Sequence, residues 1–173
     1  SRPWFFTSKM GPSPVGMVQV NLDAVFASSS RRMGFGVVIR DSLGSCLASC
    51  SGHIEGLATL EMFEALAMRE AILFVGTKGS RNIILTFDCL TLISRLNLAS
   101  RDKSTLPVPA MAKDIKRSGA DLSPVSFVHV SRVLNVTANS LARASELCVF
   151  FLSFMMSAQS VSGNLSIKTH YDE

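Results

Sequence analysis

The chain has 173 residues, of which 47% are hydrophobic and 17% charged, and its net charge is +4. This composition excludes a disordered chain, and the length suffices for one domain with a hydrophobic core. The mild positive charge is compatible with nucleic acid as a partner but does not select it. The apolar run from Leu147 to Met156 is only ten residues long, too short to span a bilayer.

The first half of the chain predicts an irregular leader followed by an antiparallel meander. Residues 1–16 are rich in Pro, Gly and Ser. Residues 17–27 alternate, which predicts a strand with Val20 and Leu22 on one face and Gln19, Asn21 and Asp23 on a polar face. Residues 33–41 and 44–54 predict two more strands, joined by a tight turn over 41–44. Gly34 and Gly36 lie inside a strand with no helix after it, which argues against a phosphate-binding loop.

The second half predicts helices alternating with two strands. Helices are expected over residues 57–79, 89–100, 104–119 and 135–147, the last opening at Asn135, and strands over 81–88 and 122–130. Helices between strands after a meander predict an α/β fold with a mixed sheet. We assign residues 17–147 to one domain and 148–173 to a C-terminal tail that is first apolar and then polar.

The four cysteines are Cys46, Cys50, Cys89 and Cys148. They form no CxxC pair and have no histidine at zinc-site spacing. They are therefore predicted to be reduced, buried thiols of an intracellular protein, nuclear or cytoplasmic.

Three acidic residues occupy positions where acids are uncommon in a packed fold. Asp23 lies on the polar face of the first strand, which a solvated face would also explain. Glu64 is centred on the apolar stripe of the first helix, where it either joins a site or reaches water at the rim of the sheet. Asp88 ends a strand and precedes a helix, so it is either a site residue or an N-cap. Each acid alone is weak evidence for a functional site, and the prediction rests on the combination of the three.

Five segments containing these acids resemble the ribonuclease H-like domains of plant genomes, which occur alone and as parts of reverse transcriptases. The opening PSPVGMVQVNLDAVF resembles the family pattern P-x-x-G-x-x-K-x-N-x-D-G-A, and FVHVSRVLNVTANSLAR resembles F-x-H-V-x-R-x-x-N-x-x-A-D-x-L-A. Between them, GFGVVIRDSLGSCLAS, EALAMREAI and IILTFDCLTLISRLN follow in register. The resemblance covers Pro12 to Ala144.

The resemblance implies a five-stranded mixed sheet in the order 3-2-1-4-5 with helices on both faces. It also implies nucleic acid binding and cleavage of the RNA strand of an RNA–DNA hybrid. In such enzymes four acidic positions hold two Mg²⁺ ions, with Mn²⁺ as an alternative, about 4 Å apart. Here these metal-binding and catalytic positions are Asp23, Glu64, Asp88 and Asn139.

Asn139 departs from the family pattern, because an acid is expected there. Asn keeps a carbonyl oxygen as a neutral ligand but lacks the negative charge, which predicts weaker metal binding and slower turnover. Ala24 replaces the usual glycine, Gln19 replaces the usual lysine, and the turn after His129 is too short for the histidine loop of the better-known hybrid nucleases. His129 itself lies inside the last predicted strand and is therefore interpreted as structural.

Three functions remain open at this point. The first is a metal-dependent hybrid ribonuclease, favoured by three intact acids. The second is a nucleic-acid-binding or interaction module without catalysis, favoured by Ala24 and Asn139. The third is a fragment derived from a retroelement, suggested by the apolar tail. The sequence gives no oligomeric state, and no membrane partner is expected.

Overall fold

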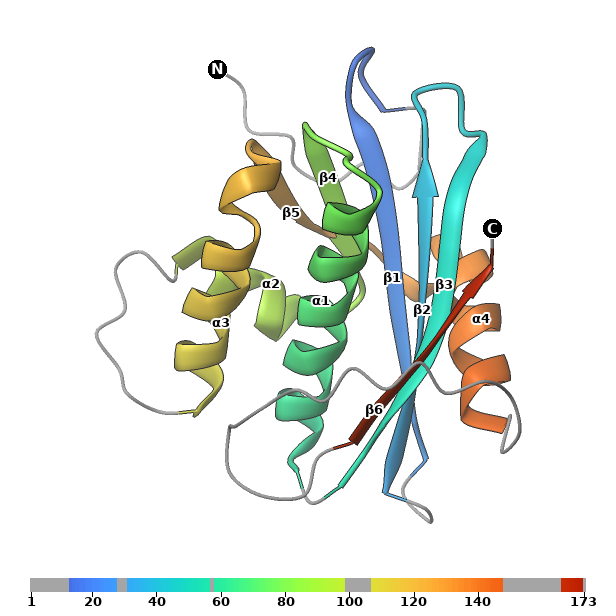
Figure 1. Ribbon diagram of the computed structural model, residues 1–173. Coiled ribbons are helices and arrows are strands. Elements are labelled where there is room, and N and C mark those ends of the chain that lie inside the picture. Colours follow the sequence, from blue (N-terminus) through green and yellow to red (C-terminus); the bar gives the residue numbers. More distant parts are fainter. Residues whose placement is uncertain (1–12, 28–30, 57, 99–106, 148–165, 173) are drawn as a thin grey trace.

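The fold is a sheet with helices on both faces (Figure 1). The computed structural model describes residues 13–27, 31–56, 58–98, 107–147 and 166–172. In chain order the strands and α-helices are β1 (Val18–Ala27), β2 (Arg32–Arg40), β3 (Cys46–Glu55), α1 (Leu60–Thr77), β4 (Ile83–Phe87), α2 (Leu90–Leu98), α3 (Pro107–Ser118), β5 (Val125–His129), α4 (Val136–Leu147) and β6 (Ser166–Asp172). Two 3₁₀ turns, η1 (Ala120–Leu122) and η2 (Arg132–Leu134), precede β5 and α4.

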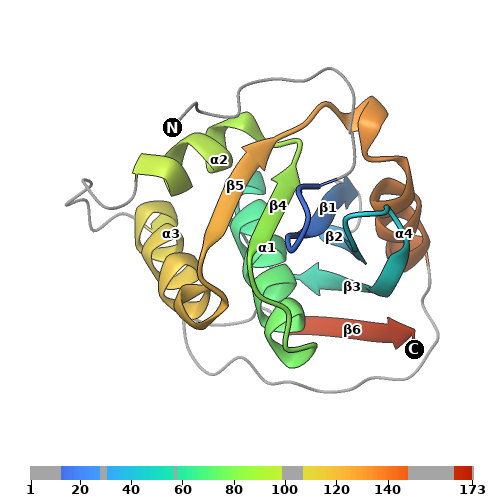
Figure 2. The ribbon, with the colours of Figure 1, turned by 90° about the horizontal axis from the view of Figure 1, so that it is seen from above.

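The sheet contains the predicted strand order 3-2-1-4-5 and one further strand. β1, β2 and β3 form an antiparallel meander, while β4 pairs parallel with β1 and β5 pairs parallel with β4. The turn between β2 and β3 is held by Asp41, whose Oδ1 accepts from the amides of Leu43 and Ser45 at 2.9 Å each. β6, which the sequence did not predict, pairs antiparallel with β3 at the edge of the sheet (Figure 2).

The main core lies between the sheet and α1. Val20 and Leu22 of β1, Phe35 of β2 and Phe63 of α1 are buried there. α1 also packs against α3, so both of its sides are covered. The helix begins three residues later than expected, because the Thr59 side chain accepts a hydrogen bond from the Met62 amide and caps it.

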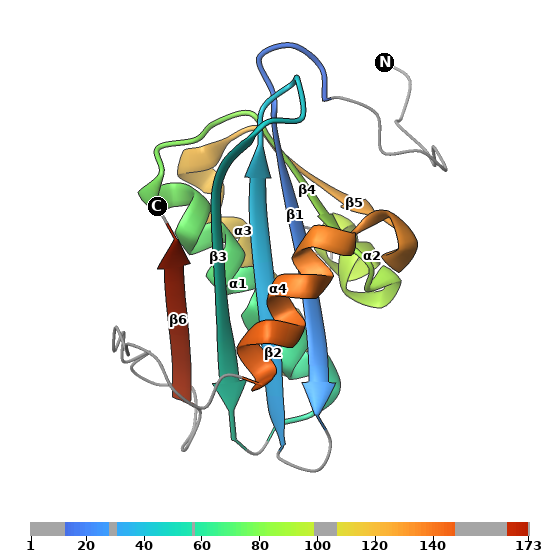
Figure 3. The ribbon, with the colours of Figure 1, turned by 90° about the vertical axis from the view of Figure 1, so that its right-hand side faces the viewer.

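Of the described helices, α4 is the one that covers the opposite face, where it packs against β1, β2 and β3 (Figure 3). Gly36 of β2 makes this possible. A Cβ built on Gly36 would lie 2.4 Å from the Ala138 carbonyl oxygen and 2.5 Å from Leu141 Cβ. Gly36 thus serves close packing of strand and helix, in agreement with the prediction that this glycine-containing stretch is not a phosphate loop.

The prediction of buried thiols is correct for Cys50 only. Cys89 is half-buried, and Cys46 is exposed because it begins β3 immediately after the surface turn. All three are free thiols. Cys148 and the apolar run after Leu147 lie outside the described residues. Among the helices that are described, none has the length and apolar character needed to cross a membrane.

Candidate active site

Asp23 is completely buried where β1 passes under α4. It pairs in register with Gly36, and its side chain is 0% exposed. The polar face of β1 is therefore not solvated, so a solvated face does not explain the acid at position 23. Gln19 and Asn21 on the same strand are buried as well.

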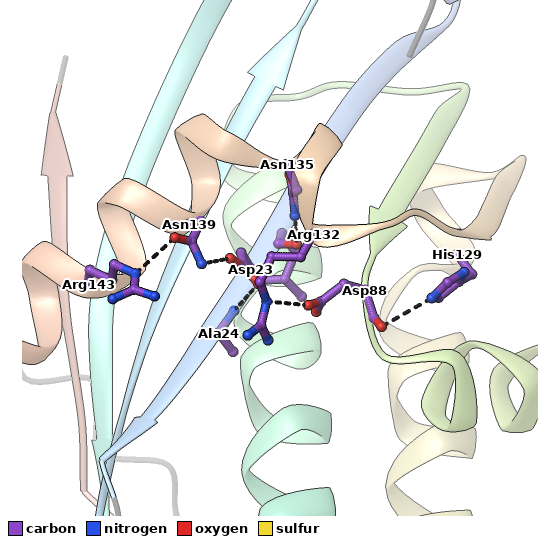
Figure 4. Close-up of polar contacts among 9 residues, drawn as sticks. Asp23, Ala24, Asp88, His129, Arg132, Asn135, Asn139 and Arg143 are labelled. Atoms are coloured by element: carbon purple, nitrogen blue, oxygen red, sulfur yellow. Dashed lines mark hydrogen bonds and ion pairs between the residues drawn. The ribbon is translucent and has the colours of Figure 1, made fainter. Parts of the chain in front are cut away.

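Asn139 of α4 faces Asp23 with its amide NH₂ group (Figure 4). Its Nδ2 donates to Asp23 Oδ2 at 2.5 Å, and its Oδ1 accepts from Arg143 Nε at 3.0 Å. Both neighbours require this orientation, because a carboxylate needs a donor and a guanidinium needs an acceptor. The carbonyl oxygen expected as a neutral metal ligand is thus directed to Arg143. The second oxygen of Asp23 accepts from the Ala24 amide at 3.0 Å.

Asn135 fixes the start of α4 against β1. Its backbone oxygen accepts from the Asn139 amide at 3.0 Å, so it opens the helix as predicted. Its side chain, in a residue only 2% exposed, donates to the Leu22 carbonyl on β1. The bond attaches α4 to the residue immediately before Asp23 and so fixes the position of Asn139.

Asp88 follows the carboxyl end of β4 and forms an ion pair with Arg132 of η2. Arg132 Nε lies 2.8 Å from Asp88 Oδ2. Cys89, not Asp88, takes the N-cap position of α2, because its carbonyl accepts from the Ile93 amide and its Sγ from the Leu92 amide. His129 Nε2 lies 3.1 Å from the Asp88 carbonyl oxygen and so contacts the backbone of this segment.

Glu64 reaches the same region from α1. It is half-buried, and its Oε2 accepts from the thiol of Cys89, the residue after Asp88, at 2.9 Å. Burial and the bond to Glu64 raise the pKa of the Cys89 thiol to about 12, so the thiol stays protonated and acts as a donor.

The three acids and Arg132 form one electrostatic cluster. Burial is the main cause that raises the pKa of Asp23 and of Glu64, and the charge of Asp88 raises both further. The bonds from Asn139 and Cys89, and the charge of Arg132, act in the opposite direction. The pKa of Arg132 is itself raised, first by its hydrogen bond to Asp88. The fold therefore brings together all four positions expected from the sequence.

The carboxylates of this cluster suit a hard cation, but in this structure they are already engaged by other groups of the chain. Carboxylate oxygens are the ligands that Mg²⁺ prefers, so Asp23, Glu64 and Asp88 fit it chemically. Each, however, already accepts a hydrogen bond from within the chain. Among the described residues, no group of three or more His, Cys, Asp and Glu side chains is arranged to hold a metal ion.

Three residues of the site were not singled out from the sequence: Cys89, Arg132 and Arg143. Arg143 could have been found, because it follows Asn139 by four residues, the spacing at which helix side chains meet. Arg132 matches the arginine of the family pattern, but the sequence analysis assigned no role to it. Cys89 carried no signal, because its contact with Glu64 joins two helices that are distant in the sequence.

Comparison with known proteins identifies the family and the fold. A family described as reverse transcriptase-like matches residues 21–145. No curated protein sequence matches the chain.

Among solved structures, ribonuclease H1 from the halophilic archaeon Halobacterium salinarum NRC-1 superposes with a TM-score of 0.66 at 20% identity, covering 75% of this chain and 97% of that one. LC11-RNase H1 in complex with an RNA/DNA hybrid gives a TM-score of 0.63 at 20% identity, covering 74% and 95%. The foamy viral protease-reverse transcriptase in complex with an RNA/DNA hybrid gives 0.57 at 16% identity, covering 84% of this chain and 22% of that one. The chain therefore has a ribonuclease H-like fold and belongs to the reverse transcriptase-like family.

Proposed function

We propose that this domain binds RNA–DNA hybrids and hydrolyses their RNA strand with the help of Mg²⁺ or Mn²⁺. One observation carries the proposal. Asp23 of β1, Glu64 of α1 and Asp88 after β4 come from three separate elements, and the charge of Asp88 raises the pKa of the other two beside the carboxyl end of β4, which runs parallel to β1. Ligands of open α/β sheets bind at such ends.

In this proposal Asp23, Glu64 and Asp88 hold the metal, and Asn139 acts through Asp23. The bound cation would supply activation of the attacking water and stabilisation of the leaving oxygen. The chain's own contribution is positioning. Gly36 admits α4, Asn135 attaches α4 to β1, and the NH₂ group of Asn139 orients the carboxylate of Asp23.

The same geometry supports slow turnover. A fourth acid would add negative charge beside Asp23, whereas the amide of Asn139 donates a hydrogen bond to that carboxylate and adds no charge. Fewer negative ligands weaken divalent cation binding. We therefore expect measurable activity only at high Mg²⁺ or with Mn²⁺.

The alternative is a module that binds nucleic acid without cutting it. The ion pair between Arg132 and Asp88 favours this alternative, because it already neutralises the charge of one carboxylate that would hold the metal. Binding and cutting are therefore measured separately. Binding is followed by fluorescence anisotropy of a labelled hybrid and of duplex DNA in EDTA, and cutting by gel analysis of the RNA strand in Mg²⁺ and in Mn²⁺.

The deciding variant is Asp88→Asn, and the matched control is Asp114→Asn, which removes an acid on the outer surface of α3. We expect the unmodified chain to cut, Asp88→Asn to bind but to lose at least tenfold in rate, and Asp114→Asn to behave as the unmodified chain. Binding without cutting by the unmodified chain would favour the module. If the hybrid does not bind, both functions are wrong.

A further inference from the structure

Arg132 brings a positive charge onto the acidic cluster. Its Nε lies 2.8 Å from Asp88 Oδ2, and its charge also lowers the pKa of Asp23 and of Glu64. The donors that meet the other two carboxylates, Asn139 and Cys89, are neutral. Among the described residues, Arg132 is also the cation whose charge acts on both Asp23 and Glu64. In the part of the chain that the structure describes, one guanidinium thus acts on all three negative groups.

The placement of Arg132 makes this compensation easy to remove. Its side chain is 60% exposed, whereas that of Asp88 is 13% exposed. Exposed ion pairs contribute little to stability, so withdrawing the guanidinium requires no unfolding. The bond to Asp88 uses Nε, while the two terminal nitrogens of a guanidinium form the fork that matches phosphate oxygens.

We propose that Arg132 is a displaceable counter-ion that occupies the acidic cluster until a divalent cation replaces it, and that then turns to a phosphate of the nucleic acid. This inference rests on the proposed function, because it assumes that Asp23, Glu64 and Asp88 can bind a metal. It predicts positive coupling between the two ligands. A phosphate that attracts Arg132 leaves Asp88 free for the cation, and a cation that takes Asp88 frees Arg132 for the phosphate.

The first test measures Mn²⁺ binding without nucleic acid, from the electron paramagnetic resonance signal of free Mn²⁺. Arg132→Gln removes the competing charge, and Arg132→Lys keeps it. Arg40→Gln is the control, because it removes an equal charge away from the acids. Arg40 contacts the Gly44 carbonyl and the Thr137 hydroxyl near the start of α4. Removing a positive charge in contact with a carboxylate removes a competitor of the cation for that carboxylate, so we expect Arg132→Gln to bind Mn²⁺ about tenfold more tightly. Arg40→Gln should change the affinity less than twofold, and Arg132→Lys should stay near the unmodified chain.

The second test follows the Nε–H resonance of Arg132 in a ¹⁵N-correlated NMR spectrum during titration with Mg²⁺. The resonance should shift with the same midpoint as metal binding, because the bond to Asp88 is lost. A purely structural arginine would keep its resonance while the metal binds. Thermal unfolding of Arg132→Gln should match that of the unmodified chain, which shows that the fold is retained.

The outcomes separate the two proposals. Equal or weaker Mn²⁺ binding by Arg132→Gln overturns the counter-ion proposal but leaves the metal site, provided that the unmodified chain binds. If no variant binds Mn²⁺, including Asn139→Asp, the metal assignment of the proposed function fails and the counter-ion proposal fails with it.

Discussion

Replacing Gly36 with alanine should separate α4 from the sheet and disrupt the site. The new Cβ would lie 2.4 Å from the Ala138 carbonyl oxygen and 2.8 Å from the Ala142 amide nitrogen. Both are backbone atoms of α4, so no side-chain rotation can remove the contact. A comfortable carbon–oxygen contact is about 3.4 Å, so helix and strand must separate by about 1 Å.

This separation has two measurable consequences. Overpacking of a core costs about 1–3 kcal/mol, and we expect the upper end because backbone must move. The same movement lengthens the bond between Asn139 and Asp23, which is 2.5 Å, to about 3.5 Å, beyond normal hydrogen-bond length. Urea unfolding measures the first effect, and the side-chain NH₂ resonances of Asn139 report the second.

Gly76→Ala is the matched control for this experiment. A Cβ on Gly76, near the end of α1, would meet only Leu122 Cδ2 at 3.9 Å, an ordinary contact. This variant should be neutral or more stable by up to about 1 kcal/mol, because alanine favours the helix. If Gly36→Ala stays within about 1 kcal/mol of the unmodified chain and keeps the Asn139 resonances, the close approach of α4 does not hold the site together.

Three further predictions concern the buried polar groups. Burial raises the pKa of Asp23 above 3.8, so the folded chain binds the proton of this carboxyl more strongly than the unfolded chain does. The free energy of unfolding therefore falls as the pH rises from about 4 through the folded pKa. Asp23→Asn should therefore be more stable at pH 7 by about 1 kcal/mol, and unfolding curves at pH 7 and pH 3.5 should show this advantage shrinking in acid. Asn135→Ala should lower stability by about 1–3 kcal/mol in urea unfolding, because it leaves the buried Leu22 carbonyl without its donor; a loss below about 0.5 kcal/mol would show that α4 is held in another way. Iodoacetamide followed by peptide mapping should label the exposed Cys46 well before Cys89, whose thiol has its pKa raised to about 12; equal rates would contradict the bond to Glu64.

Much of the fold follows from local pattern. The alternation over residues 17–27 and the turn residues at 41–44 determine β1 and the connection from β2 to β3, and both appear as predicted. The strand order came from the resemblance to ribonuclease H-like domains, because periodicity alone does not order strands. β6 was missed because it exists only through pairing with β3, more than one hundred residues earlier in the chain.

The candidate site shows the limit of sequence reasoning more sharply. The positions of Asp23, Glu64, Asp88 and Asn139 could be named from motifs, but the burial of Asp23 depends on α4 packing over Gly36, a contact between distant segments. The ion pair of Arg132 joins residues 44 positions apart. Such contacts decide which atoms face the acids, and here they place the amide NH₂ of Asn139 where a carbonyl oxygen was expected.

The most direct test is the rate at which Asn139→Asp cuts the RNA strand of a labelled RNA–DNA hybrid in Mg²⁺, relative to the unmodified chain. A carboxylate at this position cannot donate to Asp23 and adds a charged oxygen ligand beside it. If the three acids form a metal site that Asn139 weakens, Asn139→Asp should be faster by at least about tenfold. An equal or lower rate, in a variant that still folds and binds the hybrid, would contradict the metal site proposed here.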